Sequence, residues 1–402
     1  MINDKEINLL KEEVRDNLDL SSFTSDEELR LFIEERVFKY SEKRILTIPE
    51  KVYTVERIYN SLRAYDVLQP LINDTSITEI MINSANEIFI EREGIISRAE
   101  IQFENQDKLE DIIQAIVSKV NRVVNESSPI VDARLKDGSR VNIVLPPIAL
   151  KGPTMTIRKF PEKALTMKDL IEKETITEEA AEFIRKLVIS KYNIFISGGT
   201  GSGKTTFLNI LSNYIPSNER VITIEDSAEL QIKNIPNLVS METRNANTEG
   251  KGEVTISDLI RTSLRMRPNR IIVGEVRGKE ALDMLQAMNT GHEGSISTGH
   301  ANSTVDMLSR LETMVLSGAN LPIEVIRKQI NSAIDIMIHL ARIRDNSRKI
   351  VEISEIVNVD NNEFIINSIY DFVEGKLIPT GNKLKNVSKL KTEGFRGEDV
   401  NE

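Results

Sequence analysis

The 402-residue sequence contains no cysteine and no tryptophan, and aromatic residues make up only 5% of it. Without cysteine the chain forms no disulfide and no thiolate metal site, which agrees with a cytoplasmic protein. No apolar run approaches the roughly 18 residues that a membrane span requires. The charged N-terminus also lacks the apolar core of a signal peptide. The composition therefore predicts a globular cytoplasmic protein, and its length predicts two or three domains.

The charge balance is acidic, with 52 Lys and Arg against 62 Asp and Glu and a formal net charge of −10. This sign argues against a general nucleic-acid binder. No basic stretch is interleaved with aromatic side chains that would stack on bases. We therefore expect no direct binding of nucleic acid, and a helicase is disfavoured.

The first 160 residues contain two kinds of sequence pattern. Residues 1–68 are predicted to form a helical bundle, because Ser25 and Glu28 make a capping-box pattern ahead of an apolar face at helical spacing. Residues 69–160 mix alternating strand patterns with one helical stretch, and a hairpin is predicted to turn at Asp137–Gly138. This second segment is predicted to be a smaller α/β domain.

The remainder of the chain divides into a long regular segment and a short polar one. In residues 161–374, short Ile/Val-rich runs such as Arg270–Val273 alternate with helical patterns. Strands that are buried on both faces of a parallel sheet have this composition, so we expect a doubly wound, mainly parallel sheet. Residues 375–402 are polar and lysine-rich and are predicted to be a flexible tail.

A phosphate-binding loop is the most specific local pattern. The stretch GGTGSGKT, Gly198–Thr205, satisfies G-x-x-x-x-G-K-[ST], with a predicted strand before it and a helix after it. Lys204 would neutralise the β- and γ-phosphates of ATP, and the Thr205 hydroxyl would bind Mg²⁺. A glycine-rich turn with an accidental lysine is a poor alternative in this context. The predicted nucleotide-binding residues are Gly198, Gly199, Thr200, Gly201, Ser202, Gly203, Lys204, Thr205 and Thr206.

Acidic residues follow two of the other predicted strands. Glu225, Asp226 and Glu229 come after one strand, and Glu275 comes after another. In open α/β sheets ligands bind at this end of the strands. Carboxylates there can order the water ligands of Mg²⁺ or polarise an attacking water. A solvated acidic loop is an equally good interpretation of the first group taken alone. The predicted metal site comprises Thr205, Glu225, Asp226 and Glu275.

Two of the three histidines, His292 and His300, lie in the polar stretch TGHEGSISTGHANS. Neither lies on an apolar face, and two histidines without a third ligand make a poor zinc site. A role in hydrogen bonding to phosphate or to a catalytic carboxylate suits both residues better. His339, within IDIMIHLAR, is interpreted as structural.

These motifs, in this order, resemble the secretion ATPases of type II secretion, type IV pilus and type IV secretion systems. The matching stretches are Gly198–Thr205, IEDSAEL, VGEVRG and NTGHEGSISTGHANS. The stretches LRMRPNRIIVGEVRG and GPTMTIRKF are most similar to the Tad/Flp pilus motors of the CpaF family. The resemblance covers about residues 66–372. It departs from the family pattern at Asn269, Lys279 and Gly299.

The resemblance implies a RecA-like ATPase that forms a homo-hexamer. Such motors lie at the cytoplasmic face of the inner membrane, dock on platform proteins there, and use ATP with Mg²⁺ to extrude pilin subunits. They reach the membrane through partners rather than through a span of their own.

The resemblance also assigns roles to individual residues. Glu229 matches the acid that activates water, Glu275 matches the Walker B glutamate, and His292 and His300 match the histidine box. In such motors, arginines of the preceding domain close over the nucleotide. The arginines that match are Arg134, Arg140 and Arg158, and Arg244 is a further family-like arginine that we assign to nucleotide binding.

Two alternatives to a pilus motor remain open. One is a traffic ATPase of type IV secretion, which transports DNA or effector proteins. The other is a scaffold that switches partners on nucleotide binding without meaningful turnover. Lys204, Glu229 and Glu275 argue against the scaffold, because binding alone does not require an acid that activates water.

Overall fold

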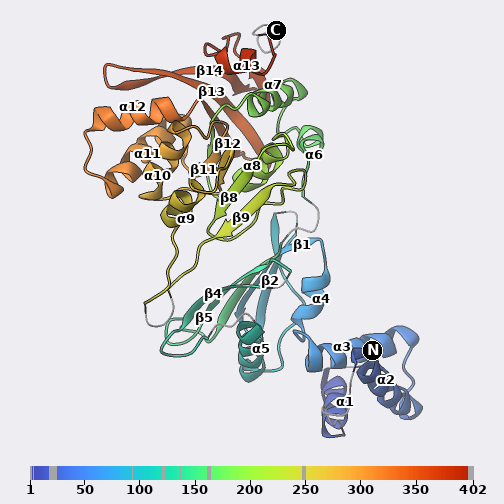
Figure 1. The fold of residues 1–402 in the computed structure, drawn as a ribbon. Coiled ribbons are helices and arrows are strands. Elements are labelled where there is room, and N and C mark those ends of the chain that lie inside the picture. Colours follow the sequence, from blue (N-terminus) through green and yellow to red (C-terminus); the bar gives the residue numbers. More distant parts are fainter. Residues whose placement is uncertain are drawn as a thin grey trace. The chain divides into compact units, whose positions relative to one another are not determined.

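The computed structural model contains two compact units, Met1–Glu162 and Lys163–Glu402 (Figure 1). The residues that it describes are 2, 4–17, 25–92, 94–119, 123–135, 137–160, 164–246 and 250–396. The helical bundle and the small α/β domain, expected as separate domains, share the first unit, although each has its own hydrophobic core.

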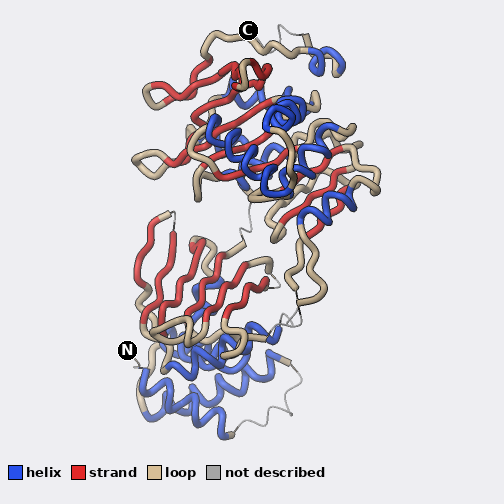
Figure 2. Tube along the Cα trace, turned by 90° about the vertical axis from the view of Figure 1, so that its left-hand side faces the viewer, coloured by secondary structure: helices blue, strands red, loops and turns tan. Residues whose placement is uncertain are grey.

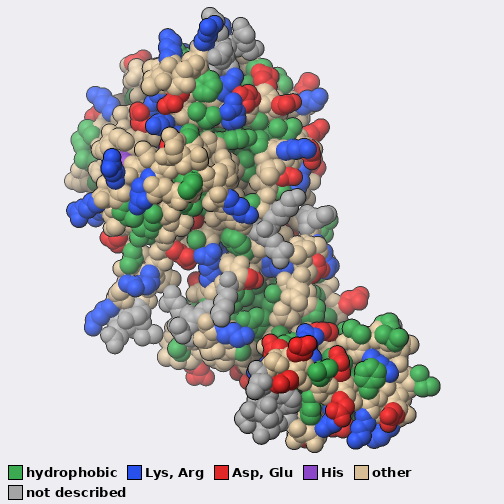
Figure 3. Space-filling view, turned by 45° about the vertical axis from the view of Figure 1, so that its right-hand side comes forward, with side chains coloured by type: hydrophobic (Ala, Val, Ile, Leu, Met, Phe, Trp, Pro, Cys, Tyr) green, Lys and Arg blue, Asp and Glu red, His purple; other side chains and the backbone are tan. Residues whose placement is uncertain are grey.

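The first unit begins with helices. They are α1 (Asp4–Asp16), α2 (Asp26–Lys43), α3 (Ile48–Arg63) and α4 (Leu68–Asn73). Leu29, Ile33 and Ile58 are fully buried between them. A capping box of Thr47 and Glu50 starts α3 at Ile48. Hydrophobic side chains stand among acidic and basic ones on the surface of these helices, at the lower right of Figure 3.

The rest of the first unit is an antiparallel sheet with one helix packed on it (Figure 2). The strand order is β3-β2-β1-β6-β5-β4. The strands are β1 (Ile77–Ser84), β2 (Glu87–Arg92), β3 (Ile95–Arg98), β4 (Ile130–Arg134), β5 (Arg140–Val144) and β6 (Thr154–Arg158), and the helix is α5 (Gln106–Lys119). The isoleucines of α5 that recur at helical spacing are buried against the alternating isoleucines of β1. The predicted hairpin is confirmed, since β4 and β5 pair on either side of Asp137–Gly138.

The second unit is built on a nine-stranded sheet with the order β15-β14-β13-β12-β7-β11-β10-β8-β9. From β12 to β9 all neighbours are parallel, as expected, and β13, β14 and β15 extend the sheet in antiparallel fashion. The strands are β7 (Ile194–Gly198), β8 (Val221–Glu225), β9 (Leu238–Glu242), β10 (Arg270–Val273), β11 (Ile296–His300), β12 (Ile336–Arg342), β13 (Arg348–Asp360), β14 (Glu363–Val373) and β15 (Lys376–Pro379).

Helices cover both faces of this sheet (Figure 1), which is why the central strands are apolar on both sides. One face packs against α6 (Met167–Glu172), α7 (Glu178–Ile189) and α8 (Lys204–Ser212). The other packs against α9 (Ile256–Ser263), α10 (Glu280–Asn289), α11 (Thr304–Gly318) and α12 (Ile323–Ala333). No helix in the described ranges is both long enough and apolar enough to cross a membrane.

The prediction of a flexible tail is wrong for residues 376–396. After β15, Leu384 and Leu390 are buried in the core, and Leu390 belongs to the short helix α13 (Ser388–Thr392). The Lys389 ammonium lies 2.7 Å from a carboxylate oxygen of Asp335, and the main-chain amides of residues 385 and 386 donate to Glu355. The sequence of this segment is polar because its buried leucines are far apart, and the segment nevertheless packs against the core. Residues 397–402 lie outside the described residues.

Candidate active site

The phosphate loop connects β7 to α8 at the carboxyl edge of the parallel strands. A Cβ atom on Gly198 would lie 2.3 Å from the carbonyl oxygen of Leu340 on β12, so only glycine fits there. Gly203 has a φ of 97° and precedes the first residue of α8. Thr205 and Thr206 lie in the first turn of α8, where main-chain amides attract anions. The loop predicted from the motif therefore has the required geometry.

Lys204 is buried at the centre of the loop. Its ammonium donates to the carbonyl oxygens of Gly198 at 3.0 Å and Gly199 at 2.9 Å, and it lies 3.1 Å from Nδ1 of His300. Burial lowers the pKa of Lys204, and the nearby Glu275 carboxylate opposes that effect. A cation is thus held where the β- and γ-phosphates of a bound nucleotide would lie.

His300, at the end of β11, bridges this lysine and Glu275. Because an ammonium can only donate, Nδ1 of His300 is the acceptor and Nε2 carries the proton. Nε2 lies 2.8 Å from Oε1 of Glu275. Burial is the main reason why the pKa of His300 is lowered, with Lys204 adding to it and Glu275 opposing it. The ring is therefore neutral at pH 7.

Arg277 extends this chain of contacts from Glu275 to a second carboxylate. Its guanidinium donates to Oε2 of Glu275 at 2.7 Å and lies 3.8 Å from the carboxylate of Asp226. Hydrogen bonding to Glu275 raises the pKa of Arg277. The structure thus brings together four of the residues singled out in the sequence, namely Lys204, His300, Glu275 and Asp226.

The residues at this site fit a magnesium ion. Oε1 of Glu275 is buried, and no donor in the described part of the chain is aligned to hydrogen-bond with it, since the close His300 nitrogen lies off the axis. A metal-bound water would supply that donor. Thr205 follows the phosphate-binding lysine, as a magnesium-binding hydroxyl does in this loop. Mg²⁺ would neutralise charge on the β- and γ-phosphates there.

Glu225, predicted as a metal ligand, is hydrogen-bonded within the acidic loop. Its buried carboxylate accepts the main-chain amides of Glu229 at 2.8 Å and Leu230 at 3.2 Å, so it holds the acidic loop in place. Its side chain also explains the glycine before Glu275, because a Cβ on Gly274 would lie 3.0 Å from Cγ of Glu225. The Glu229 side chain is half-buried on this loop.

Two predicted residues lie away from the phosphate loop within the second unit. His292 contacts the carbonyl of Ala287 at the end of α10 and precedes β11, whereas His300 ends that strand. The five residues of β11 span about 16 Å, so the two histidines lie at opposite ends of that strand. Arg244 follows the edge strand β9 and donates to Gly252, four strands from β7. Neither residue joins the Lys204 cluster.

The three arginines expected to meet the nucleotide belong to the first unit, whereas the phosphate loop belongs to the second. Arg134 on β4 lies opposite Arg140 on β5, which lies opposite Arg158 on β6. Arg158 in turn lies opposite Glu79 on β1. Burial raises the pKa of Glu79, the neighbouring Glu91 raises it further, and Arg158 opposes both. The arginines therefore form one row on one face of the antiparallel sheet.

Two contacts of the phosphate loop were not predicted from the sequence. Arg348, the first residue of β13, donates from Nε to the carbonyl of Gly201 at 2.8 Å. Nδ1 of His339 lies 2.8 Å from the hydroxyl of Ser197, the residue before the loop, and burial lowers the pKa of this histidine. The second contact agrees with the structural role inferred for His339. No motif marks Arg348, whose position only becomes visible once β12 and β13 are paired.

The fold and this cluster together define a phosphate-loop ATPase. At the carboxyl edge of the parallel sheet lie a glycine-rich loop after β7, its buried lysine, and an acid that follows β10, two strands away. The chain belongs to the type II/IV secretion system protein family, which it matches over residues 62–371. It is therefore a secretion ATPase.

Individual relatives cover most of the chain. The conjugal transfer protein TrbB of Rhizobium radiobacter is 32% identical over 316 residues, which is 77% of this chain and 92% of that protein. The type IV secretion system protein VirB11 of Brucella suis is 33% identical over 300 residues, 68% of this chain and 83% of that one. The solved structure of the ATPase DotB of Legionella pneumophila has the same fold, with a TM-score of 0.52 and 21% identity over 73% of this chain and 80% of that one.

Proposed function

We propose that this ATPase is a traffic motor of a type IV secretion machine, which moves DNA or protein through a cell envelope. The relatives TrbB and VirB11 carry names from conjugation and type IV secretion, and they match two thirds or more of the chain. They favour this function over the Tad/Flp pilus motor that the sequence stretches first indicated. Homo-hexamer formation and docking on membrane platform proteins at the cytoplasmic face belong to the same proposal.

The observation that supports turnover, rather than switching alone, is the chain Lys204–His300–Glu275 beside the phosphate loop. In our proposal Lys204 holds the β- and γ-phosphates, and the free oxygen of Glu275 orients a water bound to Mg²⁺. Glu229 remains our candidate for polarising the attacking water, because its loop is anchored by Glu225 at the same edge of the sheet. Asp226 would hold Arg277 against Glu275.

The pathway is tested in the organism that carries the gene. A Lys204→Ala substitution removes the cation from the loop while leaving the protein present, so export by the machine that it drives should stop. Transfer of plasmid DNA and secretion of effector proteins are measured beside the display of pilin on the cell surface. Loss of DNA or effector transport with normal surface pilin supports the proposal. Loss of surface pilin alone would make the protein a pilus motor.

A further inference from the structure

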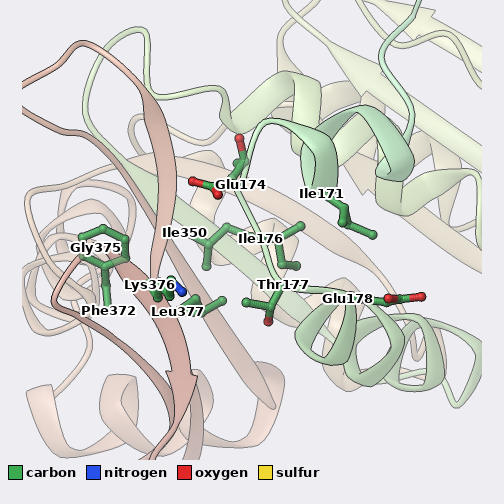
Figure 4. Close-up of a pocket in the computed structure, with 11 residues that line it drawn as sticks. Ile171, Glu174, Ile176, Thr177, Glu178, Ile350, Phe372, Gly375, Lys376 and Leu377 are labelled. Atoms are coloured by element: carbon green, nitrogen blue, oxygen red, sulfur yellow. The ribbon is translucent and has the colours of Figure 1, made fainter.

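His339 is a buried polar side chain on β12, on the face of the sheet that packs against α11. Met337, two residues earlier, belongs to the apolar core on that face, and side chains alternate between faces along a strand. Leu340 and its cross-strand partner Ile350 belong to the core on the opposite face, where Ile350 lines a pocket (Figure 4). The imidazole therefore lies in an apolar layer, where each of its nitrogens requires a hydrogen-bond partner.

Both partners of the ring lie close to the phosphate loop. Nδ1 of His339 lies 2.8 Å from the hydroxyl of Ser197, which directly precedes Gly198. The ring also hydrogen-bonds to the main chain of Asn302, and this bond raises its pKa. A bond that favours the protonated ring is one in which a ring N–H donates. Nε2 thus donates to the carbonyl of Asn302, and Nδ1 accepts from Ser197.

The ring is neutral because it is buried. Burial is the main reason why the pKa of His339 is lowered, and Lys204 adds to that effect. The carboxylates of Glu352 on β13 and Asp306 on α11 oppose it. Glu352 accepts from the hydroxyl of Thr304, the first residue of α11, at 2.8 Å. A neutral imidazole has one donor and one acceptor, and the contacts with residues 197 and 302 use both.

Asn302 belongs to the short segment that connects His300 to α11. The amide of Ala301 in this segment donates to the carbonyl of Gly198 at 3.4 Å. The same carbonyl accepts from the ammonium of Lys204. The residues that directly follow His300 are therefore fastened to the start of the phosphate loop, and His339 supplies a second link between the same two segments.

The residue before His300 offers no side chain for this purpose. A Cβ on Gly299 would lie 2.9 Å from the Sδ atom of Met307 and 3.1 Å from the ring of Phe195. On that side His300 is held by the strand ladder and by apolar packing alone. Hydrogen bonds that set the place of His300 beyond the end of β11 therefore come from the residues after it.

We propose that His339 is a positioning residue for ATP hydrolysis. By bridging Ser197 and Asn302, it fixes the segment after His300 against the phosphate loop. The ring of His300 is thereby held beside Lys204. His339 acts through His300 and not on the nucleotide, so the inference rests on the proposed role of His300 in turnover and not on the pathway that the motor serves.

Steady-state phosphate release by the full chain measures this role. His339→Leu suits a buried strand but forms neither hydrogen bond. It should lower kcat about tenfold, within the roughly 100-fold that a misplacement of about 1 Å can cost. The KM for ATP should stay within about twofold, because Lys204 and the loop amides are intact. His339→Gln, whose amide both accepts and donates, should keep most of the activity. Met337→Leu changes a buried side chain on the same strand and face and should leave kcat unchanged.

Ser197→Ala breaks the same bridge from its other end without enlarging any side chain. It should lower kcat in the same sense, and it tests the bridge even if His339→Leu does not fold. Unchanged kcat in Ser197→Ala and His339→Leu would overturn the proposal. A loss in His339→Gln as large as that in His339→Leu would also overturn it, because the shape of the ring rather than its hydrogen bonds would then matter.

A double-mutant cycle with His300 tests whether His339 acts through that residue. In a His300→Ala background, His339→Leu should cost little further activity, because the group that it positions is gone. Equal fold losses with and without the His300 side chain would overturn the proposal while leaving the protein an ATPase. No turnover in the unaltered protein would overturn the proposed hydrolysis, and this inference with it.

Discussion

His300 lies between a cation and a carboxylate, and the neighbouring ammonium decides which ring nitrogen carries the proton. It accepts from Lys204 through Nδ1, and its protonated Nε2 lies 2.8 Å from Oε1 of Glu275. Protonation of Nδ1 would place two cations 3.1 Å apart, which is one reason why the pKa is depressed. The neutral ring links the residue that binds phosphate to the residue that we assign to the metal-bound water.

We predict that His300→Ala lowers kcat roughly 100-fold, because one positioned polar group at a reacting phosphate contributes about that much. His300→Gln should keep more activity, since an amide can both accept and donate. The unaltered enzyme should lose activity as the pH falls through the depressed pKa of His300, below its ordinary value of 6.5. Profiles of kcat against pH for the three proteins test this. An acid limb that persists unchanged in His300→Gln would assign it to another group.

At the scale of single residues, the sequence predicted the loop and the acid after β10 but not which carboxylate lies beside the His300 ring. Glu225 ends β8 and Glu275 follows β10, both at the carboxyl edge of the sheet. Glu225 is turned into its own loop by two main-chain amides, and no spacing rule reveals such hydrogen bonds. His292 and His300 are eight residues apart in one polar motif, yet β11 lies between them. The presence of both histidines in one motif does not show that they lie at opposite ends of a strand.

The C-terminal helix α13 is the most informative element. It lies at the amino-terminal ends of β7 and β12, whereas the phosphate loop follows the carboxyl end of β7. Lys389 reaches Asp335, which precedes β12, and Asp335 also accepts the amide of Asn193 just before β7. Burial raises the pKa of Asp335, and Lys389 is the main group that opposes the rise. The strands that carry the loop are therefore anchored at their other end by the last described helix.

Lys389→Ala should destabilise the second unit by about 2 kcal/mol at pH 7, because it leaves a mostly buried carboxylate without its cation. A protonated Asp335 does not need that cation. The loss should therefore shrink as the pH falls toward 3.8, the ordinary pKa of an aspartate, and be greatest well above the raised pKa. Thermal unfolding at several pH values measures it, with the exposed Lys391→Ala as the matched control. Equal melting temperatures for both variants would show that the contact contributes nothing.

Among the elements, strands buried on both faces were predictable because they are continuous runs of Ile and Val. The antiparallel strands β13 and β14 were harder to predict, because polar residues interrupt their apolar runs and several of these, such as Lys349, Glu355 and Asn367, are buried. The tail was mistaken for flexible chain because its anchors, Leu377, Leu384 and Leu390, are six or seven residues apart.

At the scale of the whole molecule, two units divide the expected site residues. The phosphate loop, the acids and the histidines lie in the second unit, and the row of three arginines lies in the first. Family motifs predicted the second unit well because its chemistry is local to strand ends. The helical N-terminus carries no such motif, and its exposed Ile45 and Ile48 were not part of any expectation.

Steady-state phosphate release by the purified full chain with ATP and Mg²⁺ is the most direct test of this protein as an ATPase. We predict measurable turnover that falls at least roughly 100-fold in Glu275→Gln, which keeps the shape of the side chain but removes its charge. ATP binding should persist in that variant, since Lys204 and the loop amides are intact. Turnover equal to that of the unaltered protein, or no turnover in either, would contradict the assignment of Glu275 and the hydrolysis that it supports.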